Sequence, residues 1–190
     1  HFIRHGQTLY NSLNKIQGSS DIKLNDIGIK QAKDVVINEA YDIYQHSGLI
    51  RSEETLRIIT KNNFTLNKEE LLKERGYGIF EGLTNEEIKN KYPDIFFKWK
   101  ENENTYIENA ETIENVVLRI KKYIKKTLEN KYEKILVVTH SGFLYALYKY
   151  MKNIDYGYRP EIYFSNCCSV HLEILYDRGN VLLKLYCDNN

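Results

Sequence analysis

The sequence is poor in the residues that define several protein classes. Its 190 residues include three cysteines and two prolines, and Lys and Arg (27) nearly balance Asp and Glu (26). Three cysteines are too few for a disulfide framework, and Cys167, Cys168 and Cys187 lack the spacing of a zinc or redox site. A net charge of +1 without a basic stripe argues against a general nucleic-acid binder.

Long apolar runs are also absent. No stretch approaches the roughly 20 apolar residues that span a bilayer, and no signal peptide is visible. With reduced thiols, these absences predict a cytoplasmic protein that binds neither nucleic acid nor membrane. The sequence starts at His1, inside the first predicted strand and without a methionine, so we expect a fragment that has lost its native N-terminus.

Short apolar runs alternate with longer amphipathic ones, which predicts an α/β fold. Length and the absence of linkers or repeats favour one domain over residues 1–190. We predict strands at 1–4, 41–44, 135–138, 169–176 and 181–186, with a turn at 177–180. We predict helices at 25–40, 51–60, 112–128 and 143–151, and one that starts after Thr84 and is stopped by Pro93. Ile27, Val35 and Val36 are expected on the buried face of the first helix, and residues 91–113 are expected to form loops.

Two histidines each follow a predicted strand and precede a small-residue turn. His5 lies between Arg4 and Gly6, and His140 follows Thr139. Ligands of open α/β sheets bind beyond the carboxyl ends of the strands, so the two histidines are expected to share one site. Imidazole is a nucleophile at neutral pH, and arginine grips phosphate through two parallel N–H bonds.

Other chemistries lack their patterns. No HExxH, CxxC or acidic cluster accompanies the histidines, so no metal is expected. The Gly-x-Ser-x-Gly elbow of a triad hydrolase and the GxxxxGK[ST] loop of a nucleotide-binding protein are both missing.

A series of ordered motifs then extends over nearly the whole chain. They are Arg4-His5-Gly6-Gln7-Thr8 with Asn11, Gln17-Gly18, Leu24, Gly28 and Gln31-Ala32; residues 47–55; residues 74–82; Glu111-Thr112; Thr139-His140-Ser141-Gly142; and Asn166. In this order they resemble the histidine phosphatase superfamily, in its phosphoglycerate-mutase-like branch. The resemblance implies a three-layer α/β/α fold with a mostly parallel central sheet flanked by helices.

The resemblance also implies a mechanism. His5 would attack phosphorus and form a phosphohistidine, while Arg4, Arg51 and His140 would clamp the phosphoryl oxygens. Glu74 would act as acid and then as base, with Glu81 as a competing candidate. The remaining expected phosphate- or substrate-binding residues are Asn11, Gln17, Gly18, Tyr77, Ser141 and Gly142.

The family contains both phosphatases and mutases. The glycolytic mutases carry a lysine where this chain has Asn85, and an Arg-Arg pair where residues 97–101 offer lysines beside Glu101. Lysine does not replace a bidentate arginine, so phosphomonoester hydrolysis is the favoured activity. The alternatives are a phosphoglycerate mutase that depends on 2,3-bisphosphoglycerate, and a catalytically inactive phosphate-binding scaffold.

Partners and cofactors follow from the favoured activity. The expected partner is a small phosphorylated substrate or a phosphoprotein, and no cofactor is expected unless the mutase alternative holds. Specificity is expected in the loops of residues 91–113. The sequence leaves the oligomeric state undetermined, and a homodimer remains one alternative.

Overall fold

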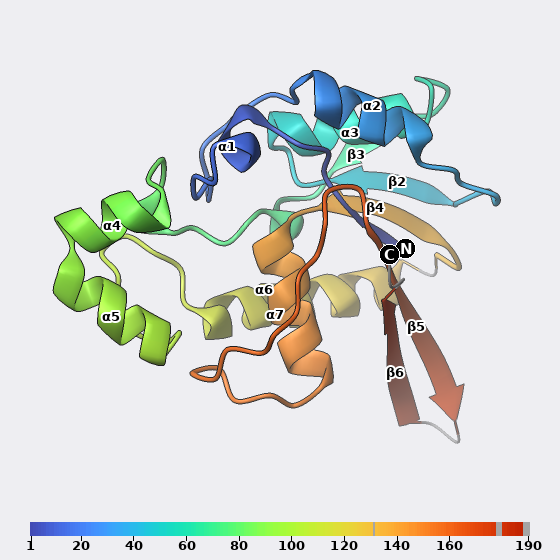
Figure 1. Cartoon of the computed structure of the whole chain (residues 1–190). Coiled ribbons are helices and arrows are strands. Elements are labelled where there is room, and N and C mark those ends of the chain that lie inside the picture. Colours follow the sequence, from blue (N-terminus) through green and yellow to red (C-terminus); the bar gives the residue numbers. More distant parts are fainter. Residues whose placement is uncertain (131, 178–179, 188–190) are drawn as a thin grey trace.

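A computed structural model describes residues 1–130, 132–177 and 180–187 as an α/β fold around one six-stranded sheet (Figure 1). The strand order is β3-β2-β4-β1-β5-β6. The strands are β1 (Phe2–Arg4), β2 (Ile43–His46), β3 (Leu66–Lys68), β4 (Ile135–Thr139), β5 (Ser169–Asp177) and β6 (Asn180–Cys187). Strands β3, β2, β4 and β1 are parallel, whereas β5 runs antiparallel to β1 and forms a hairpin with β6. The predicted α/β fold with a mostly parallel sheet is confirmed.

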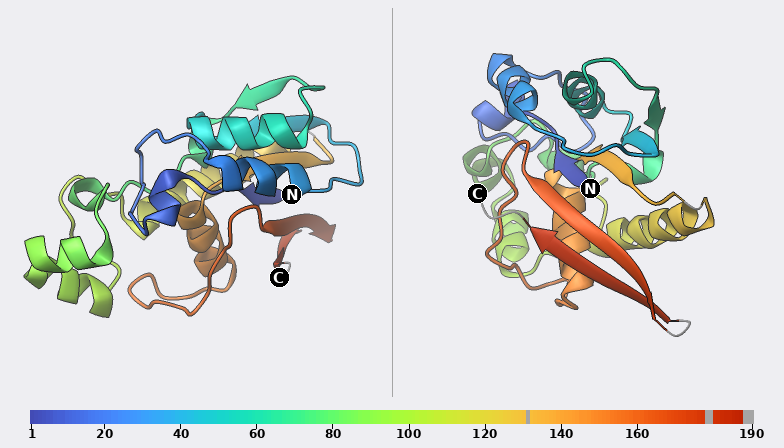
Figure 2. Two further views of the ribbon diagram at one scale, coloured as in Figure 1. Left: turned by 45° about the horizontal axis from the view of Figure 1, so that its top comes forward. Right: turned by 90° about the vertical axis from the view of Figure 1, so that its right-hand side faces the viewer.

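Helices cover both faces of the sheet. Figure 2 shows α2 and α3 on one face and α6 and α7 on the other, with α4 and α5 standing beside these layers. The helices are α1 (Leu9–Ser12), α2 (Asp26–Asp34), α3 (Ile50–Ile59), α4 (Asn85–Lys91), α5 (Pro93–Glu101), α6 (Ile113–Glu129) and α7 (Ser141–Met151). Two 3-10 turns, η1 (Glu70–Leu72) and η2 (Gly78–Phe80), lie between β3 and α4. No helix in the described part of the chain is long and apolar enough to cross a membrane.

The central strands are apolar on both sides because both sides are covered. Phe2 and Val137 pack in the cluster formed with α6 and α7, and both are almost fully buried. Their neighbours Ile3, Leu136 and Val138 point the other way, into the cluster with α3. A strand buried on both faces carries a continuous apolar run rather than an alternating one.

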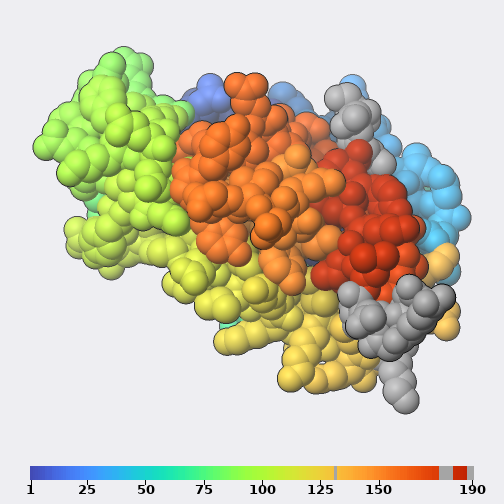
Figure 3. Space-filling model, turned by 90° about the horizontal axis from the view of Figure 1, so that it is seen from below, coloured from blue at the N-terminus to red at the C-terminus, as the bar shows by residue number. Residues whose placement is uncertain are grey.

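A separate aromatic cluster holds the segment between η2 and α6. We call residues 78–110 the cap; its buried members are Phe80, Ile88, Phe96, Trp99 and Ile107. Figure 3 shows the cap at one end of the face that α6, α7 and the segment after α7 form, with the β5–β6 hairpin at the other end. The cap therefore has a core of its own, distinct from the two cores that flank the sheet.

The first helix is shorter than predicted. Helix α2 ends at Asp34, and Val35 takes an extended conformation with φ −68° and ψ 123°. Consecutive β-branched residues disfavour helix, so the run from Val35 to Ile37 leaves it. Ile27 and Val36 are 54% and 73% exposed, and Val35 lies past the helix end and packs against the cluster with α3, so the three do not share one helix face as predicted. The next strand, β2, also starts two residues later than predicted.

Pro93 begins a helix as well as ending one. The Thr84–Glu87 capping box opens α4 as predicted, and α4 ends before Tyr92. Pro93 then occupies the first turn of α5, where a missing N–H costs no hydrogen bond. Residues 91–113 are therefore not only loops, which corrects the prediction. Strand β3 and helix α1 were not predicted, and the tip of the predicted 177–180 turn, residues 178–179, lies outside the described residues.

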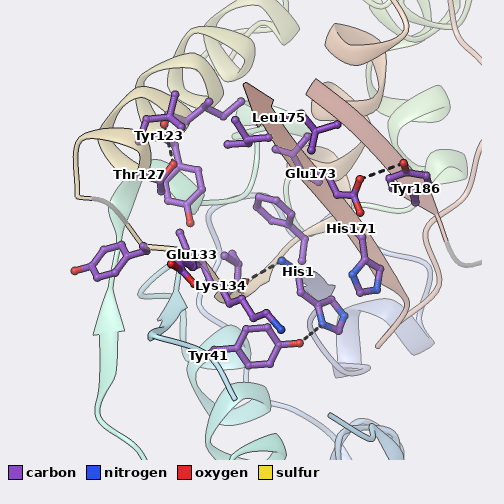
Figure 4. A pocket seen from close by; sticks show the side chains of 18 of the residues that line it. His1, Tyr41, Tyr123, Thr127, Glu133, Lys134, His171, Glu173, Leu175 and Tyr186 are labelled. Atoms are coloured by element: carbon purple, nitrogen blue, oxygen red, sulfur yellow. Dashed lines mark hydrogen bonds between the residues drawn. The ribbon is translucent and has the colours of Figure 1, made fainter. Parts of the chain in front are cut away.

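A cavity of about 1050 Å³ opens at the amino ends of β1 and β4. Figure 4 shows His1, Tyr41 and Lys134 on one side of it and β5 residues such as Glu173 on another. His1 Nδ1 lies 2.8 Å from the Tyr41 hydroxyl, which ties the first residue to the wall. This cavity is at the end of the sheet opposite the carboxyl ends of the strands, where the two motif histidines lie.

Candidate active site

The register of two parallel strands brings the motif histidines together. Strands β1 and β4 pair in register through Arg4 and Thr139, so His5 and His140 both follow the last paired position. The His5 amide donates to the Thr139 carbonyl at 2.9 Å, and the two imidazole centroids are 5.1 Å apart. Both side chains are buried. The expected shared site at the carboxyl ends of the strands is present.

The His5 ring is held in one orientation by its own neighbour. Nδ1 lies 2.7 Å from the Gly6 carbonyl oxygen, and because a carbonyl only accepts, Nδ1 carries the proton. Nε2 therefore keeps its lone pair. Burial, followed by the charges of Arg4 and Arg51, lowers the pKa of His5 well below its ordinary value. The ring is neutral at pH 7, which is the form a nucleophile requires.

Backbone carbonyls hold the two arginines in place. Arg51 is fully buried and donates through Nη1 to Ser20 O (2.6 Å) and through Nη2 to Gly18 O (2.9 Å). Arg4 donates through Nη1 to the Phe164 carbonyl and lies 3.4 Å from the exposed Tyr163 hydroxyl. These contacts fix the guanidinium planes before any ligand arrives.

Unpartnered nitrogens gather at this place. Five buried side-chain nitrogens in the described residues lack a hydrogen-bond partner, and three of them are Arg4 Nε, Arg51 Nε and His140 Nδ1. The two arginine nitrogens are donors, and buried donors are normally satisfied, so this pair requires an acceptor. An anion with several oxygens, such as a phosphoryl group, would supply acceptors for both arginines, whereas His140 Nδ1 could donate to it only after taking a proton.

A hydroxyl chain fixes the tautomer of His140. The Ser52 hydroxyl donates to Leu49 O at 2.7 Å, Ser47 Oγ lies 2.7 Å from Ser52 Oγ, and His140 Nε2 lies 2.7 Å from Ser47 Oγ. Ser52 donates its only hydroxyl proton to the Leu49 carbonyl, so the proton between Ser47 and Ser52 must come from Ser47. Ser47 then has no proton left for His140 and accepts a hydrogen bond from His140 Nε2–H. Burial, then the charge of Arg51, lowers the pKa of His140 well below its ordinary value.

Glu74 meets the site from the segment after η1. Its Oε1 accepts from the Arg75 amide at 2.8 Å, and its Oε2 accepts from the Gly142 amide at 3.2 Å. Burial raises the pKa of Glu74, against the opposing effects of Arg51 and of the two amide bonds. A β-carbon on Gly142 would lie 2.4 Å from Glu74 Oε1, so any larger residue there would displace this carboxyl group from its present position.

Glu81, the competing candidate for the acid, is used elsewhere. Its carboxylate accepts from the Ser19 amide (2.9 Å), the Ser19 hydroxyl (2.8 Å) and the Tyr77 amide (2.9 Å). These three hydrogen bonds join the Gly18 loop to the start of the cap. Glu74 is thus the carboxyl group that the structure places beside the histidines.

Thr8 organises the secondary polar residues. It caps α1 through Asn11, donates from Oγ1 to Gln17 Oε1 at 2.8 Å, and is fully buried. Asn166, singled out in the sequence, donates to His5 O at 2.9 Å and lies 3.4 Å from Asn11 Oδ1. Gly18, with φ +52°, offers its carbonyl to Arg51; the structure gives no role to its amide.

Two further predicted residues follow motif residues directly in the chain or within three positions, Ser141 after His140 and Tyr77 after Glu74. Tyr77 is half-buried; the Arg75 guanidinium lies 5.1 Å from its ring centre, and burial raises the pKa of its hydroxyl to about 12. Ser141 begins α7 directly after His140, and its side chain has a partly exposed position. The structure thus brings His5 and His140 together and joins Glu74 to Gly142, while Tyr77 and Ser141 stay predictions.

The sequence analysis gave no individual role to several supporting residues. Thr55 accepts from the Gly6 amide at 3.0 Å, and Ser52 completes the hydroxyl chain behind His140. Both lie on α3 within four residues of Arg51, so helical spacing from that arginine was the available signal. Tyr163 and Arg119 carried no such signal, because neither lies beside a motif residue. No group of three or more His, Cys, Asp or Glu among the described residues is placed to hold a metal ion.

Comparison with known proteins agrees with this geometry. The family model described as histidine phosphatase superfamily (branch 1) matches residues 1–188. Phosphoserine phosphatase 1 of Hydrogenobacter thermophilus is 27% identical over 191 residues, covering 96% of this chain and 89% of its own. A Bacillus subtilis protein named uncharacterized phosphatase PhoE is 31% identical over 189 residues, covering 94% and 90%. Other matched relatives are named 2,3-bisphosphoglycerate-dependent phosphoglycerate mutase, among them one from Buchnera aphidicola.

The fold has solved counterparts. The structure named Bacillus stearothermophilus YhfR superposes with a TM-score of 0.86 at 21% identity, covering 100% of this chain and 96% of that one. At that identity the likeness concerns the fold, whereas the family match rests on the sequence over almost the whole chain. This protein therefore belongs to the histidine phosphatase superfamily, in branch 1.

Proposed function

We propose that this protein hydrolyses phosphomonoesters without a metal, through a phosphohistidine on His5. The observation that carries the proposal is the contact of His5 Nδ1 with the Gly6 carbonyl. This contact holds the ring proton on Nδ1, so Nε2 of the neutral ring keeps its lone pair for attack. The names of two relatives, phosphoserine phosphatase and phosphatase PhoE, support the same reaction class.

In the first step, Nε2 of His5 attacks phosphorus and the bond between phosphorus and the ester oxygen breaks. Glu74 gives its proton to the departing oxygen, and burial, which raises the pKa of this carboxyl, favours the protonated form that the step requires. Arg4 and Arg51 are fixed cations that stabilise charge spread over the phosphoryl oxygens. The negative charge of a bound phosphate opposes the effect of the arginines, which lower the pKa of His140. Nδ1 of His140 can then take a proton and donate it to a phosphoryl oxygen in a hydrogen bond.

In the second step, Glu74 is a carboxylate and takes a proton from water. The oxygen of that water attacks the phosphorus of the phosphohistidine, and the bond from phosphorus to Nε2 breaks. Inorganic phosphate leaves, and both His5 and Glu74 return to their starting protonation states. One carboxyl group thus serves as acid and then as base.

The cap has few cations available to hold a second phosphate group, and this supports hydrolysis over transfer to a second organic phosphate. The Lys100 ammonium lies 4.9 Å from the Trp99 ring centre and 5.2 Å from that of Phe96, so it packs on the aromatic core of the cap. Asn85 is the first residue of α4 and carries no charge. A mutase must hold a bisphosphate, and the described cap offers no arginine pair for it.

The deciding experiment supplies 3-phosphoglycerate with catalytic 2,3-bisphosphoglycerate to metal-free protein. Both 2-phosphoglycerate and released phosphate are followed, beside a panel of phosphomonoesters. Phosphate release without isomerisation is expected. Rapid isomerisation with little release would replace the hydrolase assignment by the mutase one. His5→Ala is expected to abolish phosphate release, and near-normal activity in that variant would disprove the nucleophile.

We also propose a cytoplasmic location and a small phosphorylated molecule or a phosphoprotein as the partner. Cys167, Cys168 and Cys187 are thiols, which suits a reducing compartment. Fractionation of the native host with an antibody tests the location, and release of phosphate from phosphopeptides against free phosphomonoesters tests the class of substrate.

A further inference from the structure

A largely buried arginine on α6 lies behind the segment that carries Glu74. The Arg119 side chain is 20% exposed and forms a bidentate ion pair with Glu111, with 2.7 Å from Nε to Oε1 and 2.8 Å from Nη2 to Oε2. Its remaining Nη1 donates to Leu71 O at 2.7 Å and to Lys73 O at 3.1 Å. All three guanidinium nitrogens are therefore engaged.

The partner of this arginine holds the same segment from its other end. The Glu111 amide donates to Gly76 O at 2.9 Å, and the Glu111 carbonyl accepts from Arg75 Nε at 2.8 Å. Glu74 therefore lies between two fixed points, one at the Lys73 carbonyl and one at Arg75 and Gly76.

The orientation of the Glu74 carboxyl depends on this backbone. One of its two hydrogen bonds comes from the Arg75 amide, which is part of the clamped segment. The other comes from the Gly142 amide on α7, which is a separate element. If the 73–76 backbone shifts, the two amides no longer converge on one carboxyl group, and its oxygens leave the phosphoryl site.

We propose that Arg119, through its ion pair with Glu111, is a positioning residue for Glu74 in proton transfer to the leaving group. This inference rests on the proposed function, because it takes Glu74 as the acid. Arg119 makes no hydrogen bond with His5, Arg4, Arg51 or His140 among those of the described residues, although its charge is the smallest of the printed causes that lower the pKa of His140. Its loss is therefore expected to impair protonation while leaving nucleophile and clamp in place.

The leaving group provides a readout that a merely structural role would not move. An alkyl phosphate must receive a proton as its oxygen departs, whereas p-nitrophenyl phosphate releases a stable anion that needs little help. General acid catalysis contributes about 10²–10⁴-fold, so misplacing the acid costs a sizeable part of that factor on alkyl phosphates alone. The quantity to compare is kcat/KM, because it reports the steps up to departure of the leaving group.

The experiment measures kcat/KM of the full chain on p-nitrophenyl phosphate and on an alkyl phosphate that the wild type hydrolyses. The variants are Arg119→Gln, Arg119→Lys, Glu111→Gln and Glu74→Gln. The matched control is Arg57→Gln, which breaks another Arg–Glu pair, on the exposed side of α3. Thermal unfolding of each variant identifies any that fails to fold. Glu111→Gln keeps the backbone hydrogen bonds of residue 111 to Gly76 and Arg75, so it tests the same ion pair if Arg119→Gln does not fold.

Arg119→Gln is expected to lose about 10- to 100-fold on the alkyl phosphate and under about threefold on p-nitrophenyl phosphate. Lysine cannot form the bidentate fork, so Arg119→Lys should behave like Arg119→Gln. Equal losses on both substrates, or no loss on either, would overturn the inference. If Glu74→Gln itself shows no preference for the better leaving group, the acid assignment of the proposed function falls. If Glu74→Gln shows the preference and Arg119→Gln and Glu111→Gln do not, only the positioning role falls.

Discussion

The amide of Gly142 lies 3.2 Å from Oε2 of Glu74, and no other residue fits at position 142 without meeting that carboxylate. This relationship joins the first turn of α7, which directly follows His140, to the residue proposed as acid and base. Glycine is needed there for space and not for backbone freedom, because the contact is with a side chain.

Gly142→Ala is therefore expected to separate activity from stability. The closest atom is Oε1 of the flexible Glu74 side chain, which can swing away, and Arg75 Cβ at 3.1 Å must give by only a few tenths of an ångström. Alanine also favours a helix over glycine by up to about 1 kcal/mol. The variant should keep or raise its melting temperature and lose about 10²-fold in kcat/KM on alkyl phosphates. Calorimetry and steady-state kinetics check both parts; a large fall in melting temperature would contradict the explanation.

The pH profile of kcat/KM is expected to be bell-shaped. His5 must be neutral, and its lowered pKa places the acid limb below pH 6.5. Glu74 must be protonated, and its raised pKa moves the alkaline limb upward from the usual range of a glutamate. Profiles should be corrected for the substrate's second ionisation, whose pKa is about 6. Glu74→Gln should remove the alkaline limb, and a limb that persists would assign it to another group.

Stability is expected to fall as the medium becomes acidic. The folded pKa values of His5 and His140 are lowered, so below pH 6.5 the unfolded chain binds protons that the folded chain does not. Folding stability is thus present above pH 6.5 and lost as the pH falls toward the folded pKa values, by up to about 1.4 kcal/mol per pH unit for each histidine.

The raised pKa of Glu74 has the opposite effect, because it makes the folded state more stable as the pH falls. The histidine contribution is therefore obtained as the difference between the wild type and a variant without His140. Urea unfolding at several pH values between 7.5 and 5.5 is compared for the wild type and His140→Gln. The variant should lose less stability over this range. Identical slopes would show that His140 is not buried as a neutral ring.

A second buried ion pair is expected to matter for stability rather than for chemistry. Lys149 is fully buried on α7 and donates to Glu103 Oε2 at 2.9 Å, while Arg159 lies 3.0 Å from Glu103 Oε1. Glu103→Gln leaves a buried ammonium without its counter-charge, which costs about 3–5 kcal/mol. Denaturant unfolding measures this loss, with Glu129→Gln as the control from an exposed pair. A loss under about 1 kcal/mol would show that the backbone carbonyls around Lys149 suffice.

The sequence specified the catalytic end of the sheet well because local signals and topology agree there. The apolar run at 135–138 and the two following turns predicted β4 and the adjacent histidines, and helix α6 follows its predicted periodicity. Glu74 was found only through the motif, since an isolated glutamate in a loop has no pattern of its own.

The rest depended on contacts between distant segments. A proline is common both just after one helix and in the first turn of the next, so the sequence around Pro93 fits both cases. The second helix is stabilised by the packing of Phe96 and Trp99 in the aromatic cluster of the cap. Arg119 lies eight residues after Glu111, but both are oriented by carbonyls of residues 71–76, which no spacing rule connects to α6. Helix α2 ends early because Val35, Val36 and Ile37 are β-branched and disfavour a helix, although the spacing of apolar residues continues past Asp34.

The separate aromatic core of the cap has an evolutionary consequence. Nucleophile and clamp are anchored to strand ends and α3, whereas the cap rests on Phe80, Trp99 and their neighbours. Substitutions among these apolar residues leave the two cores that flank the sheet unchanged, whereas Glu103 ties the cap to α7 through Lys149. Relatives can therefore differ in the apolar packing of the cap while keeping the strand ends that hold His5 and His140.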